Sequence, residues 1–401
     1  MSTNTTERTE LVSFNPATGE AVDTVPVTAA QDMPAIVERA RTAQAAWSKL
    51  SIQERADIMR PIGARLAEEA DRIGEILTRE MGKPLAEGVG EVGYAASSWS
   101  EDIDEIIAAV APQSLEDDNR STTLYFDPLG VCAAITPWNF PILMPHQAVL
   151  PGLISGNTII LKPSEETPLC AQAYCDVINE FLPEGVLQII HGDEVQGKAL
   201  VSADIDLIVF TGSKSAGEHI LGSASNGLKR VILELGGKDP MVVLEGADLD
   251  AAVAFGVRNA FRNAGQVCVS TERIYVDENI ADDFEARFVE KTRELVQGNG
   301  MEDGVTIGPM ITTQQKSLVT AQIEEAVSDG ARVLHGGDSG EGNFVPLTVL
   351  TDLTHDMRIM RDETFGPVAC IQRISSDEEA IELANDTPYG LAAYLQTGSP
   401  E

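Results

Sequence analysis

Short runs of strand-forming residues alternate with helical stretches after Gly130, and this alternation limits the possible folds more than any other feature of the chain. Turn residues and an amphipathic segment separate successive runs. Strands joined in this way pair in parallel, because the intervening helix returns the chain to the same end of the sheet. We therefore expect a mostly parallel α/β sheet, built from VCAAI (131–135), TIILK (158–162), VLQII (186–190), DLIVF (206–210) and VILEL (231–235).

A second series of the same kind begins near Pro240. It contains MVVL (241–244), a helical stretch from 248 to 263, RIYV (273–276) and another helical stretch from 282 to 296. A second α/β domain is therefore expected. The length of 401 residues agrees with two domains, because single hydrophobic cores stop growing at about 250–300 residues.

The first part of the chain has a helical pattern. Apolar residues recur at spacings of three and four from Asp32 to Gly82, as amphipathic helices require. The acidic stretch that follows, 101–120, loses this periodicity. Beyond it, STTLYFDPLG (121–130) predicts a strand that leaves the main body as an arm or hairpin.

Acidic residues dominate the charge of the chain. Its 63 aspartates and glutamates outnumber 28 lysines and arginines and leave a formal net charge of −35 at pH 7. Such a field repels nucleic acids and anionic membranes, so we expect neither as a partner. Two explanations stay open: the acidic surface of an ordinary cytosolic protein, and adaptation to a salt-rich cytoplasm whose ions screen the repulsion.

The five cysteines indicate a reducing compartment. They form no CxxC pair and have no histidine-rich cluster beside them, which disfavours a disulfide framework and a zinc site. The N-terminal residues contain no apolar stretch, and no apolar run reaches the length of about 18 residues that a membrane span needs. We expect a cytoplasmic protein with no membrane span and no metal.

Cys268 is the first candidate for chemistry. It lies in FRNAGQVCVSTERIYV, between a predicted helix and a predicted strand, where Gly265 permits an unusual backbone. A thiol at such a turn could face a cleft and act as a nucleophile. A buried, unreactive thiol is the alternative, and we expect it for Cys170 and Cys175, which lie in an apolar helical stretch.

Two further polar residues favour the nucleophile. Glu234 ends the strand of VILELGGKDP, where burial would raise its pKa and make it a general base for the thiol or for a water molecule. A salt bridge is the alternative for this acid. Asn139 in TPWNFP lies between two prolines that fix the turn, so its amide could donate to an oxyanion. Capping of the next helix is the alternative for the amide.

Two strand-to-helix turns, LKPSEETP and FTGSKSAG, indicate a cofactor site at the carboxyl edge of the first sheet. Gly212 and Ser213 come at a helix N-terminus, whose backbone N–H groups can bind a pyrophosphate. Lys162 and Glu165 could hydrogen-bond a ribose. Neither turn has the pattern GxGxxG, so the common dinucleotide fingerprint is absent.

Several motifs occur together in a fixed order, and they resemble those of the aldehyde dehydrogenase superfamily. They are TPWNFP, LKPSEETP, FTGS, ELGGKDP, GQVCVS, DETFGPV and NDTPYGLAAYL. The resemblance runs from about Phe14 to the end of the chain. It implies a Rossmann-type cofactor domain, which we expect over 1–110 and 129–236. It also implies an α/β catalytic domain over 237–401 and a β-arm for oligomerisation over 111–128.

The resemblance also implies roles for single residues. Cys268 is the nucleophile, Glu234 is the general base, and Asn139 forms an oxyanion hole with the backbone N–H of Cys268. The implied reaction is the NAD(P)-dependent oxidation of an aldehyde to a carboxylic acid through a thiohemiacetal and a thioester. The implied cofactor contacts are Trp138, Asn139, Lys162, Ser164, Glu165, Gly212, Ser213, Leu235, Glu363 and Phe365.

Cofactor and substrate preferences follow from four positions. Glu165 favours NAD, because a carboxylate accepts from a free 2′-hydroxyl and repels a 2′-phosphate, while Lys162 keeps NADP possible. Arg262 resembles a carboxylate-binding arginine of succinate-semialdehyde dehydrogenases, with a surface arginine as the alternative. A second arginine of those enzymes corresponds to Gln147 here. We therefore expect a small aldehyde with a polar or anionic tail, such as succinate semialdehyde.

The chain departs from the superfamily at its end. It stops at QTGSPE, soon after NDTPYGLAAYL, whereas members of the superfamily continue further. We therefore expect a catalytic domain truncated at its C-terminus. A homodimer or homotetramer is expected if the last strand, which pairs with the arm of another subunit, is present.

Two other functions remain open. A coenzyme A acylating dehydrogenase would keep the Cys268 thiol but would not need a base at Glu234. A binding or structural protein with an inactive dehydrogenase fold would bind the cofactor without turnover. A Cys–His hydrolase is disfavoured, because no histidine lies near Cys268 in the sequence.

Overall fold

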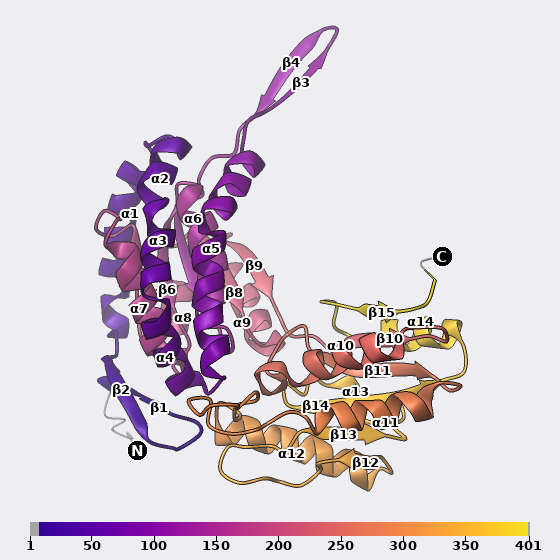
Figure 1. Cartoon of the computed structure of the whole chain (residues 1–401). Helices are drawn as coiled ribbons and strands as arrows, with labels where there is room; N and C mark the ends of the chain where they lie inside the picture. The colour runs from indigo at the N-terminus through magenta and orange to yellow at the C-terminus, as the bar shows by residue number, and fades with distance from the viewer. Residues whose placement is uncertain (1–7, 400–401) are drawn as a thin grey trace. The chain divides into compact units, whose positions relative to one another are not determined.

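The computed structural model describes residues 8–399, and the chain divides into two compact units (Figure 1). Among the described residues, unit 1 contains 8–14, Ala21–Glu80 and Leu85–Glu234. Unit 2 contains Asn15–Glu20, Met81–Pro84 and 235–399. Two short segments of the first half thus belong to unit 2, which the sequence pattern did not indicate.

Unit 1 is built on a five-stranded parallel sheet in the order β7-β6-β5-β8-β9. Every residue of β6 is buried, which agrees with its apolar centre, Ile159–Leu161. The parallel sheet expected from the sequence is confirmed. The strands are β5 (Val131–Ile135), β6 (Thr158–Lys162), β7 (Leu187–Ile189), β8 (Leu207–Thr211) and β9 (Arg230–Glu234).

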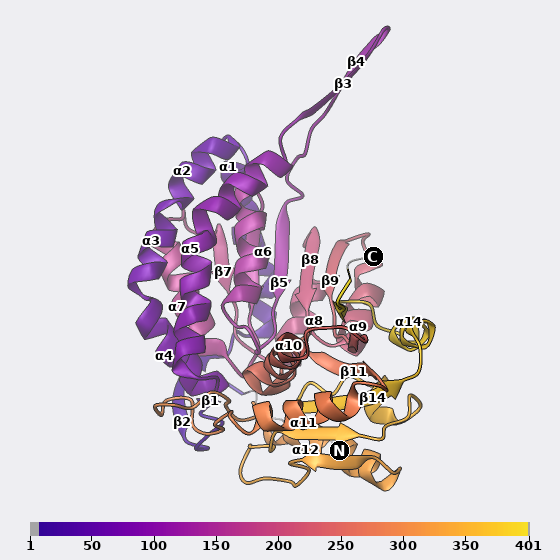
Figure 2. The same cartoon turned by 45° about the vertical axis from the view of Figure 1, so that its right-hand side comes forward.

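Helices join the successive strands of this sheet, as parallel pairing requires (Figure 2). They are α6 (Leu143–Ile154), α7 (Pro168–Asn179), α8 (Glu194–Ser202) and α9 (Lys214–Ala224). Earlier in the chain come η1 (Ala30–Asp32), α1 (Met33–Trp47), α2 (Ile52–Met59), α3 (Pro61–Glu68), α4 (Ala70–Met81) and α5 (Leu85–Ala109). α5 extends into the acidic stretch where the apolar periodicity is lost, because Trp99 and Ile103 keep one of its faces buried.

Two antiparallel hairpins complete unit 1. β1 (Glu10–Phe14) pairs with β2 (Ala21–Pro26), and β3 (Gln113–Asp117) pairs with β4 (Arg120–Leu124). In Figures 1 and 2 the hairpin β3–β4 extends away from the sheet and helices of unit 1. It lies within 111–128, the segment in which the sequence predicts an arm.

Unit 2 contains a six-stranded sheet in the order β12-β13-β14-β11-β10-β15. β12 pairs antiparallel with β13, and the pairs from β13 to β15 are parallel. The second α/β fold is therefore confirmed. The strands are β10 (Asp239–Val243), β11 (Thr271–Asp277), β12 (Arg332–His335), β13 (Thr348–Thr351), β14 (Val368–Ile374) and β15 (Tyr394–Gln396). The helices are α10 (Leu249–Phe261), η2 (Arg262–Gly265), α11 (Ala281–Thr292), α12 (Thr313–Ser328), α13 (Arg358–Arg361) and α14 (Asp377–Asn385).

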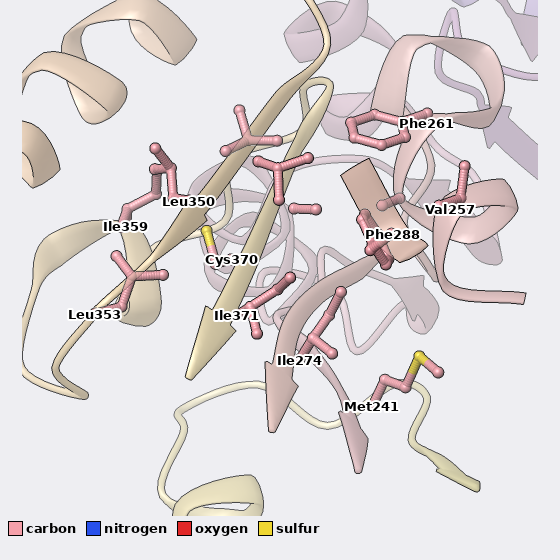
Figure 3. Close-up of a cluster of buried hydrophobic side chains, with 14 of the residues drawn as sticks. Met241, Val257, Phe261, Ile274, Phe288, Leu350, Leu353, Ile359, Cys370 and Ile371 are labelled. Carbon is pink, nitrogen blue, oxygen red and sulfur yellow. The ribbon is translucent and has the colours of Figure 1, made fainter. Parts of the chain in front are cut away.

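The hydrophobic core of unit 2 fixes the end of α10 (Figure 3). Phe261 of α10 and Phe288 of α11 are fully buried, with ring centroids 6.2 Å apart. Ile274 and Ile371, which pair across β11 and β14, fill the same cluster. Burial of side chains of this size stabilises the fold by about 1.5–3 kcal/mol each. This packing holds the residue from which the chain turns towards Cys268.

Candidate active site

Cys268 in unit 2 follows a turn with an unusual backbone. After α10 ends at Phe261, Asn263, Ala264 and Gly265 have positive φ angles of 54°, 56° and 68°. This conformation is uncommon outside glycine, and here three successive residues adopt it. The turn leads into the segment that carries the half-buried Cys268.

A buried side chain and a close backbone contact hold this turn. Gln266 Nε2 donates to the carbonyl of Asn263 at 3.0 Å and to that of Pro309 at 3.3 Å. A Cβ on Gly265 would overlap the carbonyl of Gly366. The glycine predicted to permit an unusual backbone is therefore required by packing as well as by its φ angle.

The surroundings of the Cys268 thiol keep it protonated near neutral pH. Burial raises the pKa of Cys268, and the negative charges of Glu363 and Asp239 raise it further against an opposing backbone hydrogen bond at Val269. Because the thiolate is the nucleophile, the thiol needs a base to react at neutral pH.

Two carboxyl groups of unit 2 titrate near the nucleophile. Burial, together with the neighbouring charge of Glu272, raises the pKa of Glu363 to about 7, although the N–H of Gly237 donates to Glu363 Oε1 at 3.1 Å. Burial also raises the pKa of Asp239 to about 7. Sequence analysis missed Asp239, and its position directly after GGK was the available signal.

In unit 1, the loop after β5 carries Trp138 and Asn139. Asn139 is 4% exposed and Trp138 is half-buried. The N-cap of α6 is Ile142, so Asn139 does not cap that helix. Glu91 of α5 accepts hydrogen bonds from the N–H groups of Ile142 at 2.9 Å and Leu143 at 3.1 Å. These bonds fix the chain just after Asn139, and no local pattern in the sequence links Glu91 to TPWNFP.

The turn after β6 brings Lys162, Ser164 and Glu165 together. Lys162 is buried, and its Nζ donates to the Pro163 carbonyl at 3.0 Å and lies 3.7 Å from Glu165 Oε2. Burial lowers the pKa of Lys162. The Ser164 hydroxyl accepts from the N–H of Glu166 at 3.2 Å. A carboxylate, a hydroxyl and an ammonium group are thus available for a polar ligand at this turn.

The turn after β8 opens α9. The N–H of Gly212 donates to the Glu234 carbonyl at 3.0 Å, and a Cβ on Gly212 would overlap the ring of Phe210. The Ser213 hydroxyl accepts from the N–H of Ala216 at 3.4 Å and caps the helix. The first-turn N–H groups and the helix dipole favour an anion at this end.

These turns share one edge of the sheet, because β6, β5 and β8 are neighbours and run parallel. Ligands of open α/β sheets bind at the carboxyl ends of the strands. An anion-binding helix end beside polar side chains suits the pyrophosphate and ribose of a dinucleotide. The residues of unit 1 therefore fit a dinucleotide cofactor.

Glu234 has different surroundings from those predicted. We expected a buried strand end, but Glu234 is exposed. The reason is that β9 is the edge strand of its sheet, and its side chains alternate between exposed and half-buried. The predicted burial of Glu234 is therefore wrong, whereas its predicted position at the end of a strand is confirmed.

Three further predicted residues, Leu235, Gln147 and Arg262, are outside these turns in the sequence. Arg262 directly follows α10 and is half-buried, so it is not a fully exposed surface residue. Leu235 is also half-buried. Gln147 is exposed on α6 and lines, together with Asp102 and Glu105 of α5, a cavity of about 350 Å³ inside unit 1.

Other candidate groups have structural partners. Cys170 and Cys175 are fully buried, as predicted. His146 hydrogen-bonds Asp102 at 3.0 Å and Tyr174 at 3.3 Å. Within residues 8–399, no three side chains of His, Cys, Asp or Glu are grouped so that they could hold a metal ion. The part of the chain that the structure describes contains no helix long and apolar enough to cross a membrane.

Comparison with known proteins agrees with this geometry. The model of the aldehyde dehydrogenase family matches residues 3–401. The chain is 39% identical to a probable succinate-semialdehyde dehydrogenase (NADP+) of Sinorhizobium fredii, over 97% of this chain and 81% of that protein. It is 38% identical to the glutarate-semialdehyde dehydrogenase of Pseudomonas putida, over 95% and 80% of the two chains.

A solved structure shows the same fold. The crystal structure of the aldehyde dehydrogenase from Brucella melitensis biovar abortus matches with a TM-score of 0.94 at 39% identity, over 98% of this chain and 82% of that one. Sequence and structure thus agree over nearly the whole chain. The chain belongs to the aldehyde dehydrogenase family and is an NAD(P)-dependent oxidoreductase that acts on aldehydes.

Proposed function

We propose that the chain oxidises a small polar or anionic aldehyde to a carboxylic acid, with Cys268 as nucleophile, Glu234 as general base and Asn139 as oxyanion donor. The left-handed turn before Cys268 is the observation that carries the proposal. Residues in sparsely populated conformations cluster at active sites, because the surrounding structure must hold them against strain. A cysteine that only fills a core needs no such turn.

The first step forms a carbon–sulfur bond. Because burial favours the protonated thiol of Cys268, its proton moves to a base as the sulfur adds to the aldehyde carbon. The carbonyl oxygen becomes negative, and the Asn139 amide and the backbone N–H of Cys268 donate hydrogen bonds to it. When bound, the nicotinamide cofactor accepts the hydride that this carbon loses, which leaves an acyl group on Cys268.

The second step releases the acid. Glu234 is exposed at the end of β9 and therefore accessible to water. Its carboxylate takes a proton from a water molecule as the water oxygen bonds to the acyl carbon. The carbon–sulfur bond then breaks, the Cys268 sulfur takes up a proton, and the carboxylic acid leaves.

NAD is the preferred cofactor in this proposal. Glu165 would accept from the free 2′-hydroxyl of NAD and repel the 2′-phosphate of NADP, whereas Lys162, 3.7 Å from Glu165, moderates the repulsion. Gly212 and Ser213 would hold the pyrophosphate, and Glu363 would hold the ribose next to nicotinamide. The other cofactor contacts in the proposal are Trp138, Asn139, Ser164, Leu235 and Phe365.

The proposed substrate follows from the relatives and two side chains. The named relatives act on succinate and glutarate semialdehydes, and the half-buried Arg262 could pair with a substrate carboxylate. Gln147 supplies no second cation. Succinate semialdehyde is therefore the first candidate, within a wider class of small polar aldehydes.

We also propose a cytoplasmic homodimer or homotetramer that assembles through the hairpin β3–β4. Leu115 and Leu124 on this hairpin are exposed, and burial in an oligomer would remove them from water. Light scattering with Leu115→Ser tests this proposal, because the variant should be smaller than the wild type.

The net charge of −35 favours a requirement for salt. The mutual repulsion of surface carboxylates destabilises the compact state and is screened as ionic strength rises. Thermal unfolding in dilute and in molar potassium chloride tests this requirement. A melting temperature that does not depend on salt would contradict it.

Turnover with a panel of aldehydes tests the reaction itself. NADH formation is measured with and without coenzyme A for the wild type, for Cys268→Ala and for Cys175→Ala, which removes a buried cysteine. The proposal expects a free acid without coenzyme A from the wild type and Cys175→Ala, and no product from Cys268→Ala. A thioester product that requires coenzyme A, or an active Cys268→Ala, would overturn it.

A further inference from the structure

A buried ion pair in unit 2 joins two segments next to the predicted site. Lys238 Nζ and Glu272 Oε2 are 2.6 Å apart, and the two residues are 1% and 3% exposed. Lys238 directly follows Gly237, and Glu272 comes four residues after Cys268. A buried ion pair often costs more in desolvation than it returns in attraction. A contribution to folding stability is therefore a weak explanation for the ion pair of Lys238 and Glu272.

The Glu272 carboxylate holds the loop 363–365. Its Oε2 accepts from the N–H of Thr364 at 2.8 Å, and its Oε1 accepts from the N–H of Phe365 at 2.8 Å. Phe365 has a φ angle of +50°, which a phenylalanine rarely adopts. The two hydrogen bonds thus hold the loop in a shape that its own residues disfavour.

Lys238 binds the side chain of Thr364 in the same loop. Its Nζ donates to Thr364 Oγ1 at 2.9 Å, and this hydroxyl donates to Gln322 Oε1 at 2.8 Å. Gln322 Nε2 then donates to the carbonyl of Glu363 at 3.2 Å. The carbonyl of Glu363 thus accepts from Gln322, and the N–H of Glu363 donates to Tyr389 Oη at 3.4 Å.

The ion pair also holds both sides of the contact that orients the Glu363 carboxyl group. The N–H of Gly237 donates to Glu363 Oε1 at 3.1 Å, and a Cβ on Gly236 would overlap that carboxyl group. Lys238 is the chain neighbour of Gly237, and Glu272 binds the two amides that follow Glu363. The two members of the ion pair therefore adjoin both partners of this contact.

We propose that Lys238 and Glu272 are positioning residues that hold the Glu363 carboxylate against Gly237 and thereby set the strength of cofactor binding. The inference rests on the proposed function, in which Glu363 holds the ribose next to nicotinamide. Both residues act through Glu363 and its loop.

The two charges have opposite effects on Glu363. The titratable and charged groups that face it are Glu272, Lys238, Asp239, Cys268 and Tyr389. Among these, Glu272 raises the pKa of Glu363 and Lys238 lowers it. The ionised carboxylate is the better acceptor for ribose hydroxyls, so cofactor binding should strengthen as pH rises through this pKa.

Two measurements on the full chain test the inference. Amide hydrogen exchange of the peptide 362–367 reports the loop, and fluorescence titration with NADH across pH reports cofactor binding. The variants are Glu272→Gln, Lys238→Met and Lys238→Arg. Glu285→Gln is the matched control, because Glu285 is 6% exposed and pairs with Arg373 at 3.0 Å, away from the loop.

The expected results differ among the variants. Glu272→Gln replaces one acceptor oxygen by an NH₂ group, so exchange of 362–367 should accelerate at least about tenfold. The pH midpoint of NADH binding should move down in Glu272→Gln and up in Lys238→Met. Lys238→Arg and Glu285→Gln should keep the wild-type midpoint. If Glu272→Gln does not fold, Lys238→Met still decides the question by its midpoint.

Two results would overturn the inference. One is wild-type exchange of 362–367 in a folded Glu272→Gln variant. The other is a pH midpoint that does not rise in Lys238→Met. Failure of the proposed function gives a different result, because the wild-type chain would then bind no NADH and oxidise no aldehyde. If exchange of 362–367 still accelerates in Glu272→Gln, Glu272 positions Glu363 but Glu363 has no role in cofactor binding.

Discussion

The backbone N–H of Ile142 donates a 2.9 Å hydrogen bond to Oε1 of Glu91, 51 residues earlier in the chain. This bond ties the buried face of α5 to the first residues of α6, directly after the loop that carries Asn139. The proposed oxyanion donor thus depends on a helix that supplies no catalytic group itself. Small displacements of such a donor are costly, because its catalytic value depends on its orientation.

Glu91→Ala should therefore impair catalysis more than cofactor binding. The variant leaves one buried and one partly buried N–H group without this acceptor, at a cost of about 1–3 kcal/mol in unfolding free energy. We expect kcat/KM for the aldehyde to fall about tenfold or more, and the Kd for NADH to rise by less, because Trp138 and Asn139 are only two of the proposed cofactor contacts. Glu101→Ala, an exposed site on the same helix, is the control for kinetics and urea unfolding. Equal losses in the two variants would refute the positioning role of Glu91.

The reactivity of Cys268 should depend on pH and on its acidic neighbours. Because burial and the charges of Glu363 and Asp239 raise the pKa of the thiol, alkylation by iodoacetamide should still accelerate above about pH 8.5 in the cofactor-free chain. Asp239→Asn removes one negative charge, so its profile should move to lower pH. Peptide mass spectrometry of the alkylated Cys268 measures both profiles. An Asp239→Asn profile that coincides with that of the wild type would show that this charge does not act on the thiol.

Glu80 should give the unfolding free energy a pH dependence. Its buried carboxyl group accepts from the N–H groups of Leu169 and Cys170, at 3.0 Å and 2.7 Å, and burial raises the pKa of Glu80 to about 7. The pKa in the unfolded chain is about 4.3, so the folded state binds this proton more tightly. The stabilisation of the folded state by this proton on Glu80 is fully present below about pH 4 and is lost as pH rises to about 7.

The Glu80→Gln variant isolates that contribution. Between about pH 5 and pH 8, the unfolding free energy of the wild type should fall by on the order of 2–4 kcal/mol more than that of Glu80→Gln. Urea unfolding at both pH values measures the difference. Glu184→Gln, at an exposed site, should behave like the wild type. If the unfolding free energy of Glu80→Gln falls with pH as much as that of the wild type, groups other than Glu80 cause the pH dependence.

Gln147→Arg should increase the preference for a substrate carboxylate. Gln147 shares its cavity with Asp102 and Glu105, whose charges disfavour an anionic tail. An arginine there could pair with the carboxylate of succinate semialdehyde, and we expect kcat/KM for that substrate to rise about tenfold while propanal is unaffected. Gln147→Glu is the control and should lower activity with the anionic aldehyde alone. Equal changes for both aldehydes would contradict a role in tail recognition.

Features that depend on neighbouring residues were predictable from the sequence. The apolar centre of β6 is the pattern expected of a buried strand, and the glycine at 265 marks the unusual backbone. Ala264 adopts a left-handed conformation, which its residue type does not reveal. The exposure of Glu234 depends on which strand forms the sheet edge. The sequence of a single strand does not determine its place in the sheet. The ion pair of Lys238 and Glu272 joins segments 34 residues apart.

The central claim is that Cys268 carries an acyl group which Glu234 helps water to remove. Glu234→Gln is mixed with NAD and succinate semialdehyde, quenched in acid and digested, and the mass of the Cys268 peptide is measured. The account predicts an added succinyl mass on Cys268 that accumulates in Glu234→Gln, is absent without NAD and decays rapidly in the wild type. A Cys268 peptide of unchanged mass while NADH forms, or an acyl group on another residue, would contradict the account.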